Sequence, residues 1–397
     1  MADTDLLIIG AGPAGLSTAL HLAQIAPELV ARTLILEKAA HPRPKLCGGG
    51  LLPDAENVLG RLGLDPAEIP HVDVDWARFD YDGKGFKTRP DRGRGYAFRI
   101  IRRDEFDAWL AEKTRACGFQ IQEHTTVRGL LREAESVTVE SDRGSYRARV
   151  VVGADGSTSI VRRAIVPKEE THTARLLEIV TEPRPGQSFH IQADSYFDFL
   201  YVPQGILGYS WDFPALVRGE SVRVRGIFDS NVRDVPKNLR LREALADELH
   251  HHGYDLQEYP LEGHPLRWFE SRSAFSAPRV LLVGDAAGAD ALFGEGISLA
   301  LGYGELAARA IRDAFASGDF SFRTYKPALL GSELGKALAR RTWWARFFYR
   351  LGFPRFQRFV WRHMGWFIMA VMRASLIGWS ERPPSRSRPG ATPGRPA

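Results

Sequence analysis

The stretch Gly10-Ala11-Gly12-Pro13-Ala14-Gly15 decides how the first part of the chain folds. The run Leu6-Leu7-Ile8-Ile9 before it has the composition of a buried parallel strand. Residues 16–23 after it are typical of a helix, so the glycines lie at a turn from strand to helix. The N-terminus of such a helix presents unpaired amides to which an anionic group can bind. The stretch therefore predicts a strand–turn–helix unit that binds the pyrophosphate of a dinucleotide.

Each glycine of this turn has its own role in the prediction. Gly10 permits the tight turn, Gly12 lets a pyrophosphate approach the backbone, and Gly15 lets helix and strand pack closely. Together with Ala14 in the first helical turn, they are the predicted contacts to the nucleotide. A second predicted strand ends in Glu37, at the spacing where an acid that binds ribose is expected. This carboxylate would repel a ribose 2′-phosphate, which favours FAD or NAD.

Two further glycine segments follow predicted strands far along the chain. The first, Gly153-Ala154-Asp155-Gly156, comes directly after three valines. The second, Gly284-Asp285-Ala286-Ala287-Gly288, follows the apolar run 280–283, and Gly294-Glu295-Gly296-Ile297 then opens a predicted helix. One such motif is a weak signal, whereas three in this order predict a single site for FAD.

Composition limits the class of protein. The chain has 397 residues, 44% of them hydrophobic, which is enough for two domains or for one large domain with an insertion. Cys47 and Cys117 are not in a metal-binding spacing, so neither a disulfide framework nor a zinc site is predicted. The run His250-His251-His252 closes a predicted helix, on which consecutive residues face different directions, and no metal site is expected. The N-terminus runs directly into the first strand without a signal peptide, so a cytoplasmic location is expected.

The order of predicted elements indicates an α/β fold in which an antiparallel sheet is inserted into a Rossmann-like domain. The expected division is a discontinuous FAD-binding domain over residues 1–71, 99–170 and 273–330, a substrate-binding sheet domain over 72–98 and 171–272, and C-terminal helices over 331–380. Residues 381–397 consist largely of Pro, Arg, Ser and Gly, so a disordered tail is predicted there.

The C-terminal segment has an unusual charge distribution. The formal net charge is +5, and arginines concentrate between residues 340 and 373, where they alternate with aromatic residues. This pattern favours a membrane surface over nucleic acid as a partner. The most apolar part, residues 364–379, is too short for a comfortable membrane span and contains Arg373. We therefore expect helices at the inner face of a membrane, with a lid on the protein's own surface or a dimer contact as alternatives. The oligomeric state is left open.

Three motifs resemble those of a known flavoprotein family. They are the loop Pro42-Arg43-Pro44-Lys45-Leu46-Cys47-Gly48-Gly49-Gly50, the string Tyr209-Ser210-Trp211-Asp212-Phe213-Pro214, and the stretch from Gly284 to Ile297. Their order resembles the p-hydroxybenzoate hydroxylase fold and, within it, the geranylgeranyl reductase family. The resemblance covers roughly residues 1 to 325.

This resemblance implies roles for several residues. Asp285 would bind the ribityl chain, Arg103 the diphosphate region, and the backbone at Gly294, Gly296 and Ile297 the flavin pyrimidine edge. Lys45 and Asp155 are further expected cofactor contacts from the two glycine-containing segments that carry them. Residues 289–293 lack the proline that is common in this family, which leaves the shape of the pocket over the flavin ring open.

Two features concern the substrate and the chemistry. Tyr209, Trp211 and Phe213 share one face of a strand, and Pro214 is expected to end its ladder. The row of rings is either sheet core or, as the resemblance implies, a wall of the substrate cavity. Cys47 is either an inert residue of a turn or a proton donor or positioning group near the flavin.

The sequence thus predicts an FAD-dependent oxidoreductase that acts on a lipophilic isoprenoid or prenylated substrate. The resemblance implies reduction of a C=C bond of a prenyl chain. The alternative is an NAD(P)H-dependent monooxygenase that hydroxylates or epoxidises a prenylated aromatic such as a quinone or quinolone. NADH or NADPH is the expected transient electron donor, and a ferredoxin is a further possibility. A protein that only binds FAD and has no enzymatic activity is the contrasting class.

Overall fold

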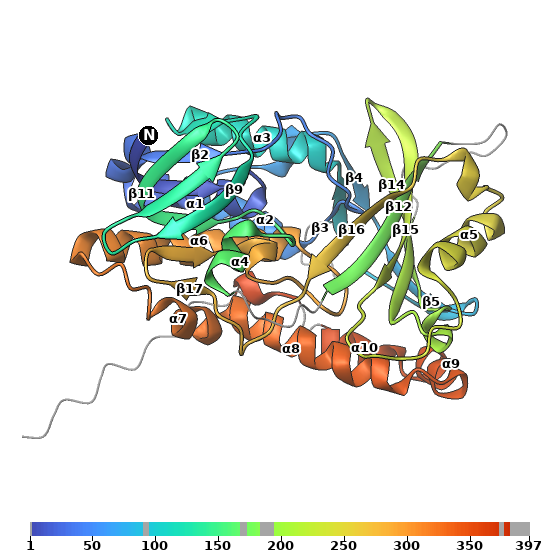
Figure 1. Ribbon diagram of the computed structural model, residues 1–397. Coiled ribbons are helices and arrows are strands. Elements are labelled where there is room, and N and C mark those ends of the chain that lie inside the picture. Colours follow the sequence, from blue (N-terminus) through green and yellow to red (C-terminus); the bar gives the residue numbers. More distant parts are fainter. Residues whose placement is uncertain (1, 90–94, 167–172, 183–193, 373–376, 382–397) are drawn as a thin grey trace, which may run out of the picture.

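The computed structural model describes residues 2–89, 95–166, 173–182, 194–372 and 377–381. Two large β-sheets lie next to each other, and the last helices of the chain run along one side of both (Figure 1). The predicted α/β fold, with a Rossmann-like part, an inserted and mainly antiparallel sheet and a helical C-terminal segment, is confirmed. The boundaries that the sequence suggests between domains stay a prediction.

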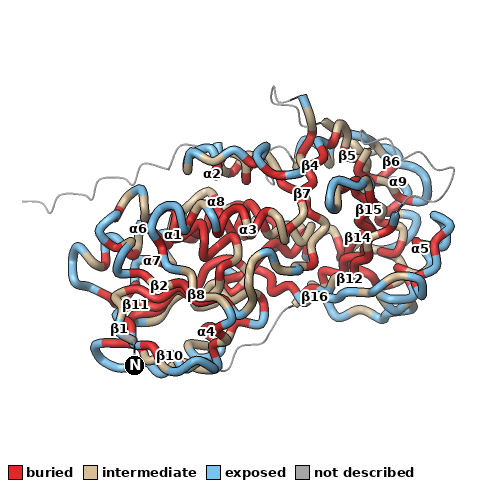
Figure 2. The backbone as a smooth tube through the Cα atoms, turned by 90° about the horizontal axis from the view of Figure 1, so that it is seen from above, coloured by how far each residue is buried: buried red, intermediate tan, exposed pale blue. Residues whose placement is uncertain are grey.

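The first sheet has the strand order β17-β18-β11-β1-β2-β8. Its centre is β1 (Ala2–Ile9), which pairs in parallel with β2 (Thr33–Leu36) and β11 (Gly144–Gly153). The second half of β1, residues 6–9, is apolar because both faces of the sheet are covered there, and residues 6–8 are fully buried (Figure 2). The other strands of this sheet are β8 (Gln120–Gln122), β9 (Val127–Arg132), β10 (Val137–Ser141), β17 (Ser276–Ala277) and β18 (Val280–Leu282).

Helices pack around this sheet. The first crossover helix, α1 (Pro13–Ile25), begins at the Gly12 turn and packs against α6 (Ile297–Ser317). Helix α3 (Arg103–Ala116) packs against α1, and α2 (Pro53–Arg61) packs against α6. The short α4 (Ile160–Ile165) follows β11.

The second sheet has the order β16-β12-β15-β14-β13-β5-β6, and all its pairs are antiparallel except β13 with β5. Its apolar residues pack against α5 (Leu241–His251) on one side and line a second core on the other. Its strands are β5 (Ala77–Tyr81), β6 (Lys84–Thr88), β12 (Thr173–Thr181), β13 (Ser195–Asp198), β14 (Gly208–Val217), β15 (Glu220–Asp229) and β16 (Glu262–Arg267). A third, smaller sheet contains β3 (Gly50–Leu51), β4 (His71–Val74) and β7 (Phe98–Ile101).

Pro214 does not end the ladder of β14, and this expectation from the sequence was wrong. The strand continues to Val217, and Pro214 stands opposite Arg223 of β15. On the other side, β13 pairs only with residues 210–212 of β14. Among the described residues, position 214 of this strand therefore has a paired neighbour on one side only, where a residue without an N–H is tolerated.

The C-terminal segment is helical, as predicted. It follows α7 (Tyr325–Gly331) and contains α8 (Glu333–Phe348), α9 (Pro354–His363) and α10 (Gly365–Val371). Helix α8 starts beside the first sheet, whereas α9 and α10 pack against β6 of the second (Figure 1). None of the helices among the described residues has both the length and the apolar character needed to cross a membrane.

The predicted disordered tail lies outside the described residues from position 382 onward. The residues just before it are ordered, because Ser380 and Glu381 belong to the helical turn Trp379–Glu381. The Ser380 amide and hydroxyl both donate to Asp54 Oδ1, at 2.8 and 2.6 Å. The end of the described chain is thus tied to α2.

The turn after β1 depends on the absence of side chains. A Cβ atom on Gly15 would lie 2.0 Å from the Gly10 carbonyl oxygen and 3.2 Å from Ala154 Cβ. A Cβ on Gly10, whose φ is +105°, would lie 2.4 Å from the Ala154 carbonyl oxygen. These distances are far below van der Waals contact, so glycine at both positions allows β1, α1 and the end of β11 to meet.

We predict that Gly15→Ala lowers the free energy of unfolding by at least about 2 kcal/mol, because the added methyl group overpacks rigid backbone. Gly60→Ala is the matched control, since Gly60 is exposed in α2 and a Cβ there has nothing within 4 Å. That change should stabilise the protein by about 0.5–1 kcal/mol through helix propensity. Urea denaturation checks both, and equal stability of Gly15→Ala and wild type would contradict the packing described.

Candidate cofactor and substrate site

One cavity of about 780 Å³ extends from the glycine turns of the first sheet to the aromatic strand of the second. All of the site residues predicted from the sequence line it except Gly15, which is buried between α1 and β1. The predicted residues in the wall are Gly10, Gly12, Ala14, Glu37, Lys45, Cys47, Arg103, Asp155, Tyr209, Trp211, Phe213, Asp285, Gly294, Gly296 and Ile297. A ligand in this cavity would contact both sheets.

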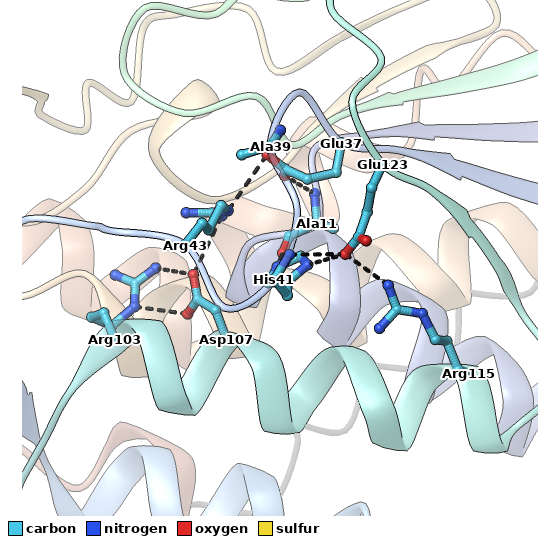
Figure 3. Close-up of polar contacts among 9 residues, drawn as sticks. All are labelled: Ala11, Glu37, Ala39, His41, Arg43, Arg103, Asp107, Arg115 and Glu123. Carbon is cyan, nitrogen blue, oxygen red and sulfur yellow. Dashed lines mark hydrogen bonds and ion pairs between the residues drawn. The ribbon is translucent and has the colours of Figure 1, made fainter. Parts of the chain in front are cut away.

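Glu37 lies at the end of β2 and is buried. Its Oε2 accepts a hydrogen bond from the Ala11 amide at 2.8 Å, and its Oε1 accepts one from the Ala39 amide at 3.2 Å (Figure 3). A carboxylate can accept about four hydrogen bonds, so capacity for ribose hydroxyls remains. The side chain therefore fixes the glycine turn and also faces the cavity.

Arg43 is a cation of the site that the sequence analysis did not name as a cofactor contact. Its guanidinium lies 3.4 Å from Glu37 Oε1 and 3.3 Å from Asp107 Oδ2 (Figure 3). A Cβ atom built on Gly12 would lie 3.5 Å from Arg43 Nη2, so this guanidinium is next to the glycine turn. The sequence shows Arg43 between two prolines in the loop Pro42-Arg43-Pro44, which is the only sign of a fixed cation. Its partners are 6 and 64 positions away and come together only in the folded chain.

Arg103 and Asp107 form a buried pair one helical turn apart on α3. The Arg103 guanidinium donates to both carboxylate oxygens of Asp107, at 2.8 and 2.9 Å. This fork geometry holds the arginine at the cavity wall with its charge balanced. Since Arg43 binds the same carboxylate, two guanidinium groups converge where the diphosphate is predicted.

A further contact fixes the turn from outside the cavity wall. His41 Nε2 lies 3.0 Å from the Ala11 carbonyl oxygen, and His41 Nδ1 lies 2.8 Å from Glu123 Oε1 (Figure 3). Arg115 donates to the same oxygen at 2.7 Å. Burial raises the pKa of Glu123, but these hydrogen bonds outweigh burial and lower the pKa to about 2. The carboxylate is therefore charged throughout the physiological range.

The two predicted aspartates differ in their surroundings. Both oxygens of Asp155 accept hydrogen bonds at the start of α4, Oδ1 from Ser159 Oγ at 2.5 Å and Oδ2 from the Ile160 amide at 2.6 Å. Asp285, at the end of β18, accepts one hydrogen bond from Ser157 Oγ at 3.2 Å and lies in the cavity wall. Asp285 thus keeps more acceptor capacity for a ligand, and a cofactor contact from the Asp155 side chain stays a prediction.

The N-terminus of α6 faces the cavity at Gly296 and Ile297. Gly296 provides no side-chain cap, so the first amides of this 21-residue helix are partly free. Glu295 binds the Ser298 amide at 2.8 Å. The positive end of the helix dipole is thus available to an anionic edge of a ligand.

The loop that carries Cys47 is held against the second sheet. The Cys47 amide donates to Glu178 Oε1 of β12 at 3.4 Å, and Cys47 Sγ accepts from the Gly49 amide at 3.4 Å. Burial raises the pKa of Glu178 to about 7. Sequence analysis missed Glu178, because an alternating strand gives no sign that one of its acids is buried.

Lys45 reaches across the cavity to His264 on β16. The Lys45 ammonium lies 2.6 Å from His264 Nε2, which fits a charged lysine that donates to a neutral imidazole. Burial lowers the pKa of Lys45, and burial together with the Lys45 charge lowers the pKa of His264 to about 4. This pair links the loop to the second sheet.

The aromatic row lies along the same cavity. Tyr209, Trp211 and Phe213 are buried, and neighbouring ring centroids are 6.3 and 6.5 Å apart. Asp212 points to the other face, where it pairs with Arg223 at 2.6 Å. The predicted shared face is therefore present.

The family model described as FAD binding domain matches residues 3–293. The chain belongs to this family of FAD-dependent oxidoreductases. The residues at the cavity also suit FAD, because Arg43, Arg103 and the α6 terminus are donors for a diphosphate and a flavin edge. Glu37 and Asp285 are acceptors for hydroxyl groups, and Gly12 leaves room for a close approach.

Relatives of known name include reductases. The digeranylgeranylglycerophospholipid reductase of Thermoplasma volcanium is 26% identical over 81% of this chain and 81% of its own. The menaquinone reductase of Mycolicibacterium smegmatis is 25% identical over 85% of this chain and 83% of its own.

Two solved structures share the fold. A geranylgeranyl bacteriochlorophyll reductase-like protein of Thermoplasma acidophilum has a TM-score of 0.69 and 21% identity, over 89% of this chain and 88% of its own. The p-nitrophenol 4-monooxygenase of Pseudomonas putida has a TM-score of 0.69 and 20% identity, over 94% and 97%.

We predict that Glu178→Gln changes how stability depends on pH. The carboxyl has a pKa near 4.5 when unfolded and about 7 when folded, so its contribution is present below 4.5 and is lost as the pH rises through 7. From pH 5 to pH 8 the variant should gain about 2–3 kcal/mol in unfolding free energy relative to wild type. Urea denaturation at both pH values measures this. Glu220→Gln, at an exposed site on β15, should follow wild type, and a parallel profile for Glu178→Gln would refute the assignment.

Proposed function

We propose that the protein reduces a C=C bond of a prenyl chain in a lipophilic substrate. The observation that carries this proposal is the single cavity shared by the FAD-binding turns and the aromatic row of β14. A prenyl chain there would lie between the flavin side and rings that bury apolar surface. The names of the two reductase relatives support the same reaction class.

The cavity has further apolar lining residues besides the aromatic row. Met369 and Met372 of the C-terminal segment line it, together with Ile377, and Leu52 and Pro53 face it from the start of α2. Methionine side chains adapt to ligands of irregular shape, which suits a long branched chain. The C-terminal segment therefore closes the substrate end in this proposal.

The chemistry needs a hydride and a proton on the two carbons of the double bond. Bound FAD, after two-electron reduction by the electron donor, would supply the hydride. Cys47 is the proposed proton donor, because its half-buried thiol lines the cavity and is anchored through Glu178 and Gly49. NADH or NADPH is the proposed electron donor.

The alternative is a monooxygenase that acts on a prenylated aromatic such as a quinone or quinolone. The shared fold with p-nitrophenol 4-monooxygenase favours it. A mostly apolar cavity that excludes water would serve this reaction as well.

Product mass distinguishes the two. With NADH or NADPH and digeranylgeranylglycerophospholipid, or with menaquinone whose quinol is reoxidised in air before analysis, we expect a gain of two hydrogens per reduced bond in a reaction run without oxygen. Cys47→Ser should lower turnover by about a hundredfold or more, as is typical when a general acid is lost, and should still take up FAD. A gain of one oxygen atom, only in air, would contradict the reductase proposal and support the monooxygenase. Normal turnover of Cys47→Ser would exclude the thiol as the proton donor.

We also propose that the C-terminal segment lies on an anionic membrane surface. Residues 334–380 contain no Asp or Glu and nine Lys or Arg. Six large aromatic side chains of this segment are at least 40% exposed, namely Trp343, Phe347, Phe353, Phe359, Trp366 and Phe367. Aromatic residues next to cations are the composition of helices that lie at a lipid interface. A lipophilic substrate would then be available next to the cavity.

Flotation with phosphatidylglycerol vesicles tests this surface. The double variant Phe359→Ser, Trp366→Ser should weaken binding by about tenfold or more, because each large apolar side chain contributes about 1.5–3 kcal/mol when buried. Leu131→Ser is the control, since Leu131 is 63% exposed on β9, far from this segment in sequence. The proposal would be contradicted if wild-type protein floated with neither phosphatidylglycerol nor phosphatidylcholine vesicles.

A further inference from the structure

Residues 288–294, between the last glycine motifs, form a loop whose backbone is held by side-chain hydroxyls from four separate elements. Tyr303 of α6 donates to the Gly288 carbonyl at 2.9 Å, and Tyr349, after α8, donates to the Leu292 carbonyl at 3.1 Å. Ser230 donates to the Ala291 carbonyl, and Tyr209 to that of Phe293. The loop lacks a proline, so these contacts restrict its conformation instead.

Asp290 of this loop and Glu295, which directly follows it, are two buried acids that share one cation. Arg341 Nη1 lies 3.2 Å from Asp290 Oδ2 and 2.8 Å from Glu295 Oε2. The side chains are almost inaccessible, with exposed fractions of 2% for Arg341, 0% for Asp290 and 9% for Glu295. Arg341 comes from α8, whereas the acids are 51 and 46 positions earlier.

Each acid also fixes backbone. Asp290 Oδ1 accepts from the Leu292 amide at 2.7 Å, and Glu295 accepts from the Ser298 amide and hydroxyl, both at 2.8 Å. The three charged groups therefore connect α8, the loop and the first turn of α6. Both Arg341 and Glu295 line the cavity at Gly294 and Gly296, where the flavin is expected.

We infer that Arg341 is a positioning residue of the FAD site, which it completes from the C-terminal helix α8. Its guanidinium neutralises two carboxylates that would otherwise repel each other in a buried place. Without it, Asp290 and Glu295 must move toward water, and residues 290–298 must follow them. The first amides of α6 would then lose the arrangement that suits the flavin edge.

This inference rests on the FAD-binding family and not on the proposed substrate. The family match alone gives no role to Arg341, because the matched residues end at position 293 and Arg341 lies beyond them. The C-terminal segment would thus have two separate tasks. Its buried residue Arg341 orders the cofactor site, and its exposed aromatic residues form the proposed membrane contact.

The test compares FAD dissociation constants, measured by quenching of flavin fluorescence on the full chain. Arg341→Gln should bind FAD at least about tenfold more weakly, since removal of one partner from a buried ion network is strongly unfavourable. Arg341→Lys keeps the charge and should stay within about threefold of wild type. Arg346→Gln is the matched control, because Arg346 is on the same helix and pairs with Glu270 at the surface. A folded Arg341→Gln with unchanged FAD affinity would overturn the inference.

A measurement on the unaltered chain covers the case in which Arg341→Gln does not fold. Amide hydrogen exchange of wild type is compared with and without FAD. FAD should slow exchange in the part of α8 around Arg341 as well as at residues 290–298, because the ion network links the two segments. Slower exchange at residues 290–298 with no change in α8 would overturn the inference.

Discussion

The close approach of three backbone segments at the end of β1 is the constraint on which the rest of the structure depends. Gly10 and Gly15 allow α1 to start directly against the end of β11, where Ala154 leaves no room for a side chain. Because β1, β2, β11 and β18 run in parallel, their carboxyl ends meet at this edge. Glu37 and Asp285 follow two of these ends, so the fold itself brings the acceptors of the site together.

The second sheet turns this edge into a cavity. Its aromatic strand β14 lies opposite the glycine turns, and the pair Lys45–His264 joins the loop of the first part to β16. Met369 of α10 and Met372, just after this helix, also line the cavity. An FAD-binding edge without this sheet would lack the aromatic part of the cavity wall.

Local patterns predicted much of the site. The glycine turns, the Glu37 position and the period-two aromatic row follow from spacing alone, and the structure has them in one cavity. Partners that are distant in sequence could not be predicted, since ionic pairs such as Arg43 with Asp107 depend on where helices pack. The burial of Glu178 and the one-sided pairing at Pro214 likewise depend on neighbouring strands. Sequence period identifies the face of a strand, and tertiary packing decides what covers it.

We conclude that the glycine turns at residues 10–15, 153–156 and 284–297 form one binding site for a single FAD. The most direct test is the stoichiometry of flavin to protein after the purified full chain is saturated with FAD and freed of excess ligand. Absorbance at the flavin bands, with the protein concentration from amino-acid analysis, should give one FAD per chain. A chain that is folded by circular dichroism but retains no flavin would contradict the account.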